Sequence, residues 1–157
     1  MNEQPSRTLF VFVQAAGKAC ALPLAAVIET MRPLPVEPIG GMPNFVHGLS
    51  CIRGELLPVV DLGLLLGAEA RIASRRYLTV RCGERRFALA VEEVLGTGHL
   101  DRAQIEPLPP LLGEAGAGIV ASIGRLDRAV LQVLETAHLF SDAQWRAVAL
   151  EIARRAG

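Results

Sequence analysis

An internal duplication is the feature that most constrains the fold of this chain. Residues 20–28 read CALPLAAVI, and residues 87–95 read FALAVEEVL. A strand with alternating apolar residues precedes each of these two segments. A glycine turn separates that strand from the segment in both cases, as is typical of a β-hairpin. At an offset of 67, the matched positions are Ala21 with Ala88, Leu22 with Leu89, and Val27 with Val94.

The two predicted hairpins use the strands Leu9–Val13 and Tyr77–Cys82, with turns at Gly17 and Gly83. A second match, at an offset of 74, relates Val59, Val60, Asp61, Leu65 and Leu66 to Val133, Leu134, Glu135, Leu139 and Phe140. The second half therefore repeats the plan of the first. Turn signals recur about every ten residues and leave no room for a regular crossover helix, which predicts two small β-barrels instead of a parallel α/β sheet.

The segment 48–62, GLSCIRGELLPVVDL, places one arginine between two apolar runs. We expect a strand, a turn at Arg53 and Gly54, a second strand, and one helical turn that Asp61 caps and Gly67 ends. Because proline has no N–H, Pro58 should lie at a strand start, an edge or a bulge. This arrangement would present Arg53 from a rigid sheet.

Two proline-rich connections, Pro33–Pro43 and Pro107–Pro110, lie at comparable places in the two halves. Proline restrains its own backbone and that of the residue before it, so we expect ordered, extended loops. The glycine-rich segment Gly113–Gly118 matches no phosphate-binding motif and is interpreted as a mobile surface loop.

The C-terminus has the pattern of an amphipathic helix. Ser141 and Gln144 have the spacing of a capping box. Arg154 and Arg155 would lie in the last turn, where they complement the helix dipole, and this explains them without a binding role. The predicted docking face consists of Trp145, Val148, Ala149 and Ile152.

Composition excludes several classes of protein. The formal net charge is zero, with 16 basic and 16 acidic residues, which argues against nucleic acid or an anionic membrane as a partner held by bulk electrostatics. No apolar stretch approaches the ~20 residues that cross a bilayer, and no signal peptide precedes Leu9, so we expect a cytoplasmic protein. Cys20, Cys51 and Cys82 are odd in number and widely spaced, and we expect small buried side chains in a reducing compartment.

A hydrolase or thiol enzyme is one possible interpretation, because His47, Ser50, Cys51 and Asp61 lie within a short segment. A nucleophile needs an adjacent base and an oxyanion hole, and neither a GxSxG elbow nor another nucleophile motif is present. The histidines are scattered and no CxxC occurs, so no metal site is expected. A receiver domain would need a suitably placed lysine, and Lys18 is the only one. The residues predict a binding protein with no catalytic, metal or cofactor site.

The chain closely resembles the CheW-like adaptor family of bacterial chemosensory systems. The resemblance rests on the motif in segment 48–62 and extends over nearly the whole chain. It implies two interlinked five-stranded SH3-like barrels over residues 9–140, after a tail at 1–8 and before a helix at 141–157. The residues that carry the motif are Gly48, Arg53, Gly54, Pro58, Val59, Asp61 and Leu62.

The resemblance also implies a function. Such proteins are non-catalytic scaffolds that couple transmembrane chemoreceptors to a CheA-type histidine kinase. The receptor tips dock in a groove between the barrels, and the similar domain of the kinase packs barrel to barrel. Other CheW-like proteins are further candidate partners, and the adaptor would be recruited to receptor arrays at the inner membrane. The contact residues implied by position are Val27, Glu29, Arg53 and Gly54.

Other interpretations stay open from sequence alone. The output could be twitching or surface sensing instead of swimming, or the same barrels could form a small-ligand sensor or enzyme. Arg53 could pair within the chain with Asp61 or Glu55, and Glu29 could be a solvated strand end. Departures from the family pattern at Cys51, Gln132 and Glu135 bear on partner choice. The second half has no arginine and glycine in register with Arg53 and Gly54, so the two barrels should differ in what they bind.

Overall fold

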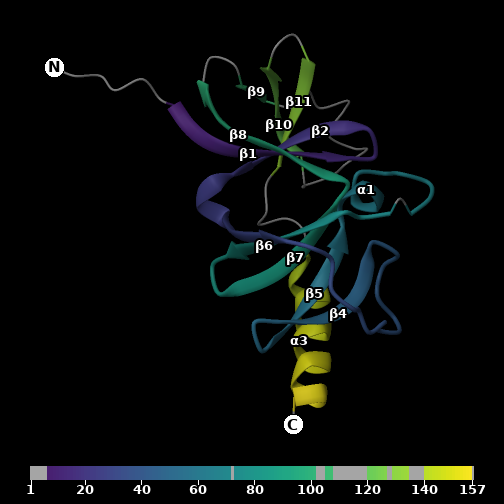
Figure 1. The fold of residues 1–157 in the computed structure, drawn as a ribbon. Helices are drawn as coiled ribbons and strands as arrows, with labels where there is room; N and C mark the ends of the chain where they lie inside the picture. Colours follow the sequence, from purple (N-terminus) through teal and green to yellow (C-terminus); the bar gives the residue numbers. More distant parts are fainter. Residues whose placement is uncertain are drawn as a thin grey trace, which may run out of the picture.

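A computed structural model describes residues 7–71, 73–101, 105–107, 120–126, 129–134 and 140–156. The chain is mainly β, with two sheets, short helical turns and one longer C-terminal helix (Figure 1). The strands are β1 (Arg7–Ala15), β2 (Lys18–Pro23), β3 (Val27–Met31), β4 (Val46–Ile52), β5 (Glu55–Asp61), β6 (Arg76–Cys82), β7 (Arg85–Val91), β8 (Glu93–Asp101), β9 (Ile105–Pro107), β10 (Val120–Leu126) and β11 (Ala129–Leu134). The helices are the 3-10 turn η1 (Leu24–Ala26), α1 (Leu62–Leu65) and α3 (Asp142–Ala156).

The two sheets exchange strands between the halves of the chain. Sheet A has the order β8-β1-β2-β11-β10-β9, and sheet B has the order β3-β6-β7-β5-β4. Each predicted hairpin is present, β1–β2 in sheet A and β6–β7 in sheet B, and each is flanked by strands from the other half. The predicted mainly β fold with two interlinked units is therefore confirmed.

The register of the sheets follows the duplication residue by residue. In sheet B, Val59 of β5 pairs in parallel with Ala88 of β7. In sheet A, Val133 of β11 pairs in parallel with Ala21 of β2. These two pairs are equivalent, because Val59 matches Val133 and Ala21 matches Ala88 in the two sequence repeats. Each half of the chain thus contributes a strand to the sheet that holds the hairpin of the other half: β5 pairs with β7 in sheet B, and β11 pairs with β2 in sheet A.

Sheet B has five strands, and sheet A has β9 as a sixth. In β9, Glu106 pairs with Ile123 of β10, and at the equivalent place Glu37 forms an isolated bridge with Leu49 of β4. Both glutamates precede a proline. The first proline-rich connection is therefore ordered along a sheet edge, as predicted, but makes only one bridge there.

Apolar side chains alternate between different cores along the central strands. On β1, Val11 and Val13 contact a large core shared by both sheets, whereas Phe10 and Phe12 contact a second core within sheet A. A third core lies within sheet B and includes Tyr77 and Ala88. Because both faces of these strands are buried, their sequences are nearly continuous apolar runs.

Pro58 lies inside β5, opposite Leu49 of β4. Of the three places predicted for Pro58, a strand start, an edge or a bulge, the strand start is therefore excluded. Pairing of β5 with β7 begins only at Val59, so that side of the strand is still an edge at Pro58. The missing N–H therefore removes no bond of the β5–β7 ladder.

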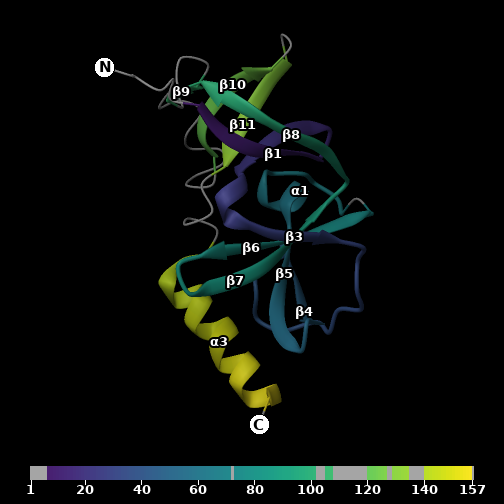
Figure 2. The same cartoon turned by 60° about the vertical axis from the view of Figure 1, so that its left-hand side comes forward.

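Helix α3 packs against sheet B (Figure 2). The predicted capping box is confirmed: Ser141 N–H donates to Gln144 Oε1 at 3.0 Å, and Gln144 N–H donates to Ser141 Oγ at 3.1 Å. Val148 is fully buried, with Trp145 and Ile152 packed beside it. The prediction for Ala149 is wrong, because this residue is exposed.

Two other sequence predictions concern this architecture. Cys20 is buried and Cys82 half-buried, but Cys51 is exposed, contrary to expectation. The predicted loop at Gly113–Gly118 lies outside the described residues, as do positions 108–110 of the second proline-rich connection.

Candidate interaction site

The β4–β5 hairpin presents Arg53 at its tip. Arg53 and Gly54 form a two-residue turn, with φ of 54° and 79°. Two successive left-handed residues are the geometry of a type I′ turn, whose twist matches that of the flanking strands. The second position is glycine, as such turns favour, but the first is an arginine in a conformation that few side chains adopt. The predicted turn is therefore present, and Arg53 is exposed on it.

Arg53 binds both carboxylate oxygens of Glu29 of β3 through two nitrogens of its guanidinium. Its Nε donates to Glu29 Oε1 at 3.1 Å, and its Nη2 donates to Glu29 Oε2 at 2.9 Å. Two of the four residues implied by the family resemblance therefore contact each other. The intramolecular partners considered from sequence were wrong, because Glu55 pairs with Arg86 and Asp61 pairs with His47.

This ion pair joins the two ends of sheet B. The sheet begins with β3 and ends with β5 and β4, so Glu29 and Arg53 lie on strands at opposite ends of the hydrogen-bonded order. Their contact shows that the sheet curls until its ends meet. The hydrogen bond from Arg53 lowers the pKa of Glu29, and the same bond raises the pKa of Arg53, so both groups are charged at neutral pH. We call this pair the Glu29–Arg53 clasp.

A β-bulge in β3 places an apolar side chain beside the clasp. Val27 pairs with Val80 and Glu29 with Thr79, which leaves Ile28 as the extra residue. Ile28 is 43% exposed, whereas Val27 is half-buried and packs against the shared core. The sequence prediction named Val27 and missed Ile28. The only signal for Ile28 in the sequence is that a large apolar residue stands between Val27 and Glu29 in a half-buried strand.

Gly48 allows the first proline-rich loop to cross β4. Its φ is 142°, and a Cβ there would lie 2.0 Å from the backbone oxygen of Glu37. Glu37 exchanges two backbone hydrogen bonds with Leu49, at 2.7 and 2.8 Å. At the end of α3, Arg155 Nη1 donates to Glu37 Oε2 at 2.6 Å. The loop is therefore fixed to β4 a few residues before Arg53, and Arg155 has a role in addition to the predicted dipole interaction.

Asp61 connects the end of β5 to β4 and α1. Its Oδ1 accepts from Leu64 N–H at 3.0 Å, the predicted N-cap, and its Oδ2 lies 2.9 Å from Nε2 of His47. Burial by itself would raise the pKa of Asp61, but the hydrogen bonds from His47 and Leu64 outweigh it, and the pKa is lowered. The other ring nitrogen of His47, Nδ1, is buried without a hydrogen-bond partner in the described structure.

The Asp61→Asn variant should therefore be less stable than the wild type at neutral pH, by about 1–3 kcal/mol, because it removes a charged acceptor. An acid with a lowered pKa in the folded state stabilises the protein above its unfolded pKa of about 3.9, and this contribution is lost as pH falls through the folded value. The stability difference between the two proteins should thus shrink below about pH 4. Urea unfolding at a series of pH values measures it; a difference that is constant with pH would contradict the assignment.

Of the candidate catalytic residues, His47 and Asp61 bind each other, but Ser50 is bonded elsewhere. Ser50 is buried, and its Oγ donates to the carbonyl oxygen of Pro35 at 2.9 Å, while His47 is bound to Asp61. Outside this set, burial raises the pKa of the Cys20 thiol to about 12, which makes it a poor nucleophile. Within the described ranges, no three His, Cys, Asp or Glu side chains gather as metal ligands. None of the described helices has the length and apolar character needed to span a membrane.

Comparison with known proteins settles the family. The protein-family model of the CheW-like domain matches residues 9–144 of this chain. The chain belongs to the CheW-like domain family. This confirms the resemblance that the Gly48–Leu62 motif indicated, and the protein is accordingly a CheW-like adaptor.

Individual relatives agree with this assignment. Protein FrzA of Myxococcus xanthus is 33% identical over 152 residues, which cover 93% of this chain and 92% of FrzA. Chemotaxis protein CheW of Helicobacter pylori is 24% identical over 116 residues, which cover 73% of this chain and 70% of that protein. The crystal structure of the scaffolding protein TtCheW from Thermoanaerobacter tengcongensis superposes with a TM-score of 0.79, at 24% identity, over 90% of this chain and 96% of that one. The last comparison supports the SH3-like barrel fold.

Proposed function

We propose that this protein is a non-catalytic adaptor that couples chemoreceptors to a CheA-type histidine kinase in the cytoplasm, at receptor arrays on the inner membrane. The observation that carries the proposal is the Glu29–Arg53 clasp at the tip of the motif hairpin. It fixes a guanidinium in one exposed position on a rigid sheet of a CheW-like domain.

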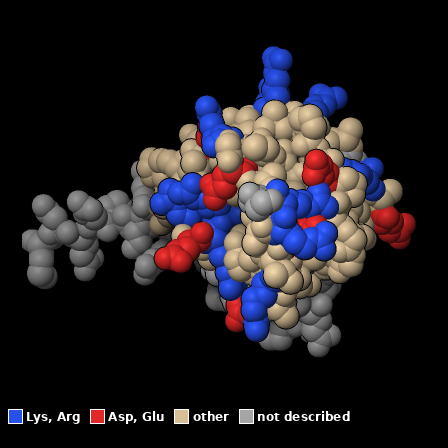
Figure 3. Space-filling view, turned by 90° about the horizontal axis from the view of Figure 1, so that it is seen from below, with Lys and Arg blue, Asp and Glu red and all other residues tan. Residues whose placement is uncertain are grey.

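The surface around the clasp has the properties that protein recognition needs. An interface gains affinity from buried apolar anchors, while oriented charges set its register. Ile28 supplies an exposed apolar side chain, and the clasp supplies charges whose geometry is already fixed before binding. Seen from the C-terminal end of α3, acidic and basic side chains are interspersed (Figure 3), as expected for specific contacts and not for a single-signed binding surface.

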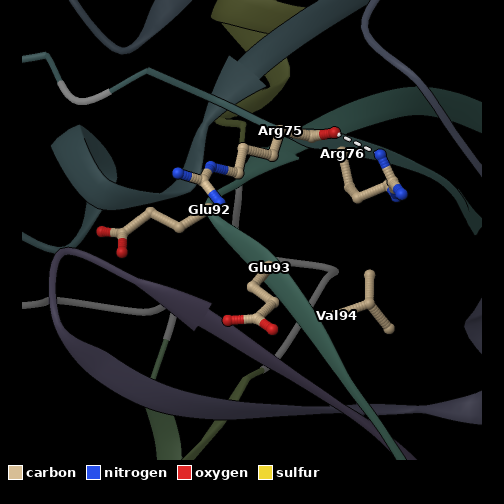
Figure 4. A pocket seen from close by; sticks show the side chains of 5 residues that line it. All are labelled: Arg75, Arg76, Glu92, Glu93 and Val94. Carbon is tan, nitrogen blue, oxygen red and sulfur yellow. Dashed lines mark hydrogen bonds between the residues drawn. The ribbon is translucent and has the colours of Figure 1, made fainter.

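An adaptor for another chemosensory output, such as twitching or surface sensing, would use the same fold and the same site. The genes adjacent to this one would distinguish the two outputs. A small-ligand sensor is less well supported: a hollow of about 240 Å³ beside β6 and β8 is lined mostly by charged side chains (Figure 4), whereas ligand pockets are mostly apolar and enclosed.

The proposal predicts that Arg53→Ala leaves the fold intact and weakens the coupling of receptors to the kinase. The test is kinase activity in a reconstituted mixture of receptor, adaptor and CheA-type kinase, together with a pull-down against the kinase and the receptor tips. Arg81→Ala is the matched control, since Arg81 is an exposed strand arginine that makes no ion pair within the described residues. Equal kinase activation by all three proteins would refute a role for Arg53, and failure of the wild type to bind either partner would refute the adaptor function.

A further inference from the structure

The gap between β3 and β4 in sheet B is closed by a few separate contacts. Within the described residues, β3 forms a ladder only with β6, and β4 only with β5. A barrel that closes completely would instead have hydrogen-bonded strands all round. The contacts across the gap, made by β3 or by the loop that follows it, are the Glu29–Arg53 clasp, the hydrogen bond from Ser50 to Pro35, and the bridge between Glu37 and Leu49.

Helix α3 holds the loop side of this closure from outside. Near the end of the helix, Arg155 Nη1 donates to Glu37 Oε2 at 2.6 Å, and Nη2 donates to the carbonyl oxygen of Pro38 at 3.3 Å. Its Nε donates to Glu151 Oε1 at 2.8 Å, which orients the guanidinium on the helix. Glu37 is also the residue that bridges to Leu49 of β4. One guanidinium thus ties α3 to the loop at the place where the loop contacts β4.

The other end of α3 is fixed to β7. Arg85 donates to Asp142 Oδ1 at 2.9 Å, and its guanidinium lies 5.4 Å from the ring centroid of Trp145, a cation–π contact. Phe140 packs edge-on against Phe87 of β7 and against Trp145, with ring centroids 5.9 and 5.6 Å apart. Between its two ends the helix contacts β5. In the order of sheet B, α3 therefore runs from β7, over β5, to the loop that lies on β4 (Figure 2).

We propose that α3 is a brace that sets the closure of sheet B, and that Arg155 is the positioning residue through which it holds the Glu29–Arg53 clasp in place. The loop that Arg155 fixes connects β3, which carries Glu29, to β4, which leads into the turn at Arg53. The family match ends at residue 144, so the contacts of Arg155 are not among the features on which the family assignment rests. The inference rests on the proposed function of the clasp.

The first test uses the full chain without partners. In Arg155→Ala, the amide hydrogens of Glu37 and Leu49 should exchange with solvent about tenfold faster, because the loop loses its outer anchor. The Nε–H resonance of Arg53 in a proton–nitrogen NMR spectrum reports on its bond to Glu29, and this resonance should shift. A brace that only stabilised the fold would leave the Arg53 resonance of the folded protein unchanged.

Arg154→Ala is the matched control. Arg154 is the neighbouring residue of the helix and removes the same charge, but its ion pair, at 3.5 Å, is with Glu151 and not with the loop. This variant should keep the exchange rates and the Arg53 resonance of the wild type. Equal effects of Arg154→Ala and Arg155→Ala, or an unchanged Arg53 resonance in Arg155→Ala, would overturn the proposal.

A double-mutant cycle identifies the contact through which the brace acts. Glu37→Ala should shift the Arg53 resonance in the same direction as Arg155→Ala, because each variant removes one side of the same ion pair. The effects of the two substitutions should not add in the double variant, whereas those of Glu37→Ala and Arg154→Ala should add. Additive effects of Glu37→Ala and Arg155→Ala would mean that Arg155 does not position the clasp through Glu37.

Kinase assays show whether the brace matters for coupling. In a reconstituted mixture of receptor, adaptor and CheA-type kinase, half-maximal activation should need about three- to tenfold more of Arg155→Ala than of the wild type or Arg154→Ala. Wild-type coupling by Arg155→Ala despite a shifted Arg53 resonance would refute the positioning role. A wild-type protein that does not couple receptor to kinase would refute the adaptor function instead, and the measurements without partners would still decide whether α3 sets the closure.

Discussion

Gly48→Ala should lower the free energy of unfolding by about 3 kcal/mol, the upper end of the cost of overpacking. A Cβ at this position would lie 2.0 Å from the backbone oxygen of Glu37, and the φ of 142° is one that alanine rarely adopts. The loop cannot move away easily, because Glu37 is bonded to Leu49 on one side and to Arg155 on the other. Urea unfolding should show a lower midpoint with little change in slope.

Gly40→Ala is the matched control for this substitution. Gly40 lies in the same loop, but a Cβ there meets nothing within 4 Å and its φ is not left-handed. We expect a change within about 0.5 kcal/mol. If the two variants lost the same stability, the close approach between β4 and the loop would not be the reason that the motif begins with glycine.

The second large effect concerns the Glu29–Arg53 clasp. Glu29→Arg and Arg53→Glu should each reduce receptor-controlled kinase activity by about tenfold or more, as expected when a central interface residue is lost. The double variant restores an ion pair with reversed polarity. We expect it to recover the native closure of sheet B but not kinase coupling, because the charge presented to the partners has changed sign.

Three measurements separate the two roles of the clasp. Thermal unfolding reports on closure of sheet B, the pull-down on binding, and kinase assays on coupling. Glu55→Arg with Arg86→Glu is the matched control, since this neighbouring pair at 3.4 Å also joins exposed side chains of sheet B. Full recovery of coupling in the E29R/R53E protein would mean that the clasp acts only by shaping the sheet, and Arg53 would no longer be a contact residue.

The residues explain why some features were predictable. The hairpins follow from alternation and glycine turns, and the Asp61 cap follows from a local pattern of three residues. The partner of Arg53 did not follow, because Glu29 is 24 residues away and reaches Arg53 only when sheet B curls. For the same reason Asp61 and Glu55, which are nearer in sequence, were the wrong expectation. Cys51 was misjudged because flanking apolar residues do not reveal where along a strand the burial ends: Leu49, two residues earlier on the same face, is buried, whereas Cys51, near the hairpin tip, is exposed.

The sequence by itself determined the repeated β plan, the turn at Arg53 and Gly54, and membership of the CheW-like family, because these depend on local patterns and on a motif. Only the tertiary structure decided how the halves exchange strands, which carboxylate holds Arg53, and why Gly48 has no side chain. Those features depend on contacts between segments far apart in the chain. Local propensity does not encode such contacts; they form when the apolar faces of both halves are buried together in one shared core.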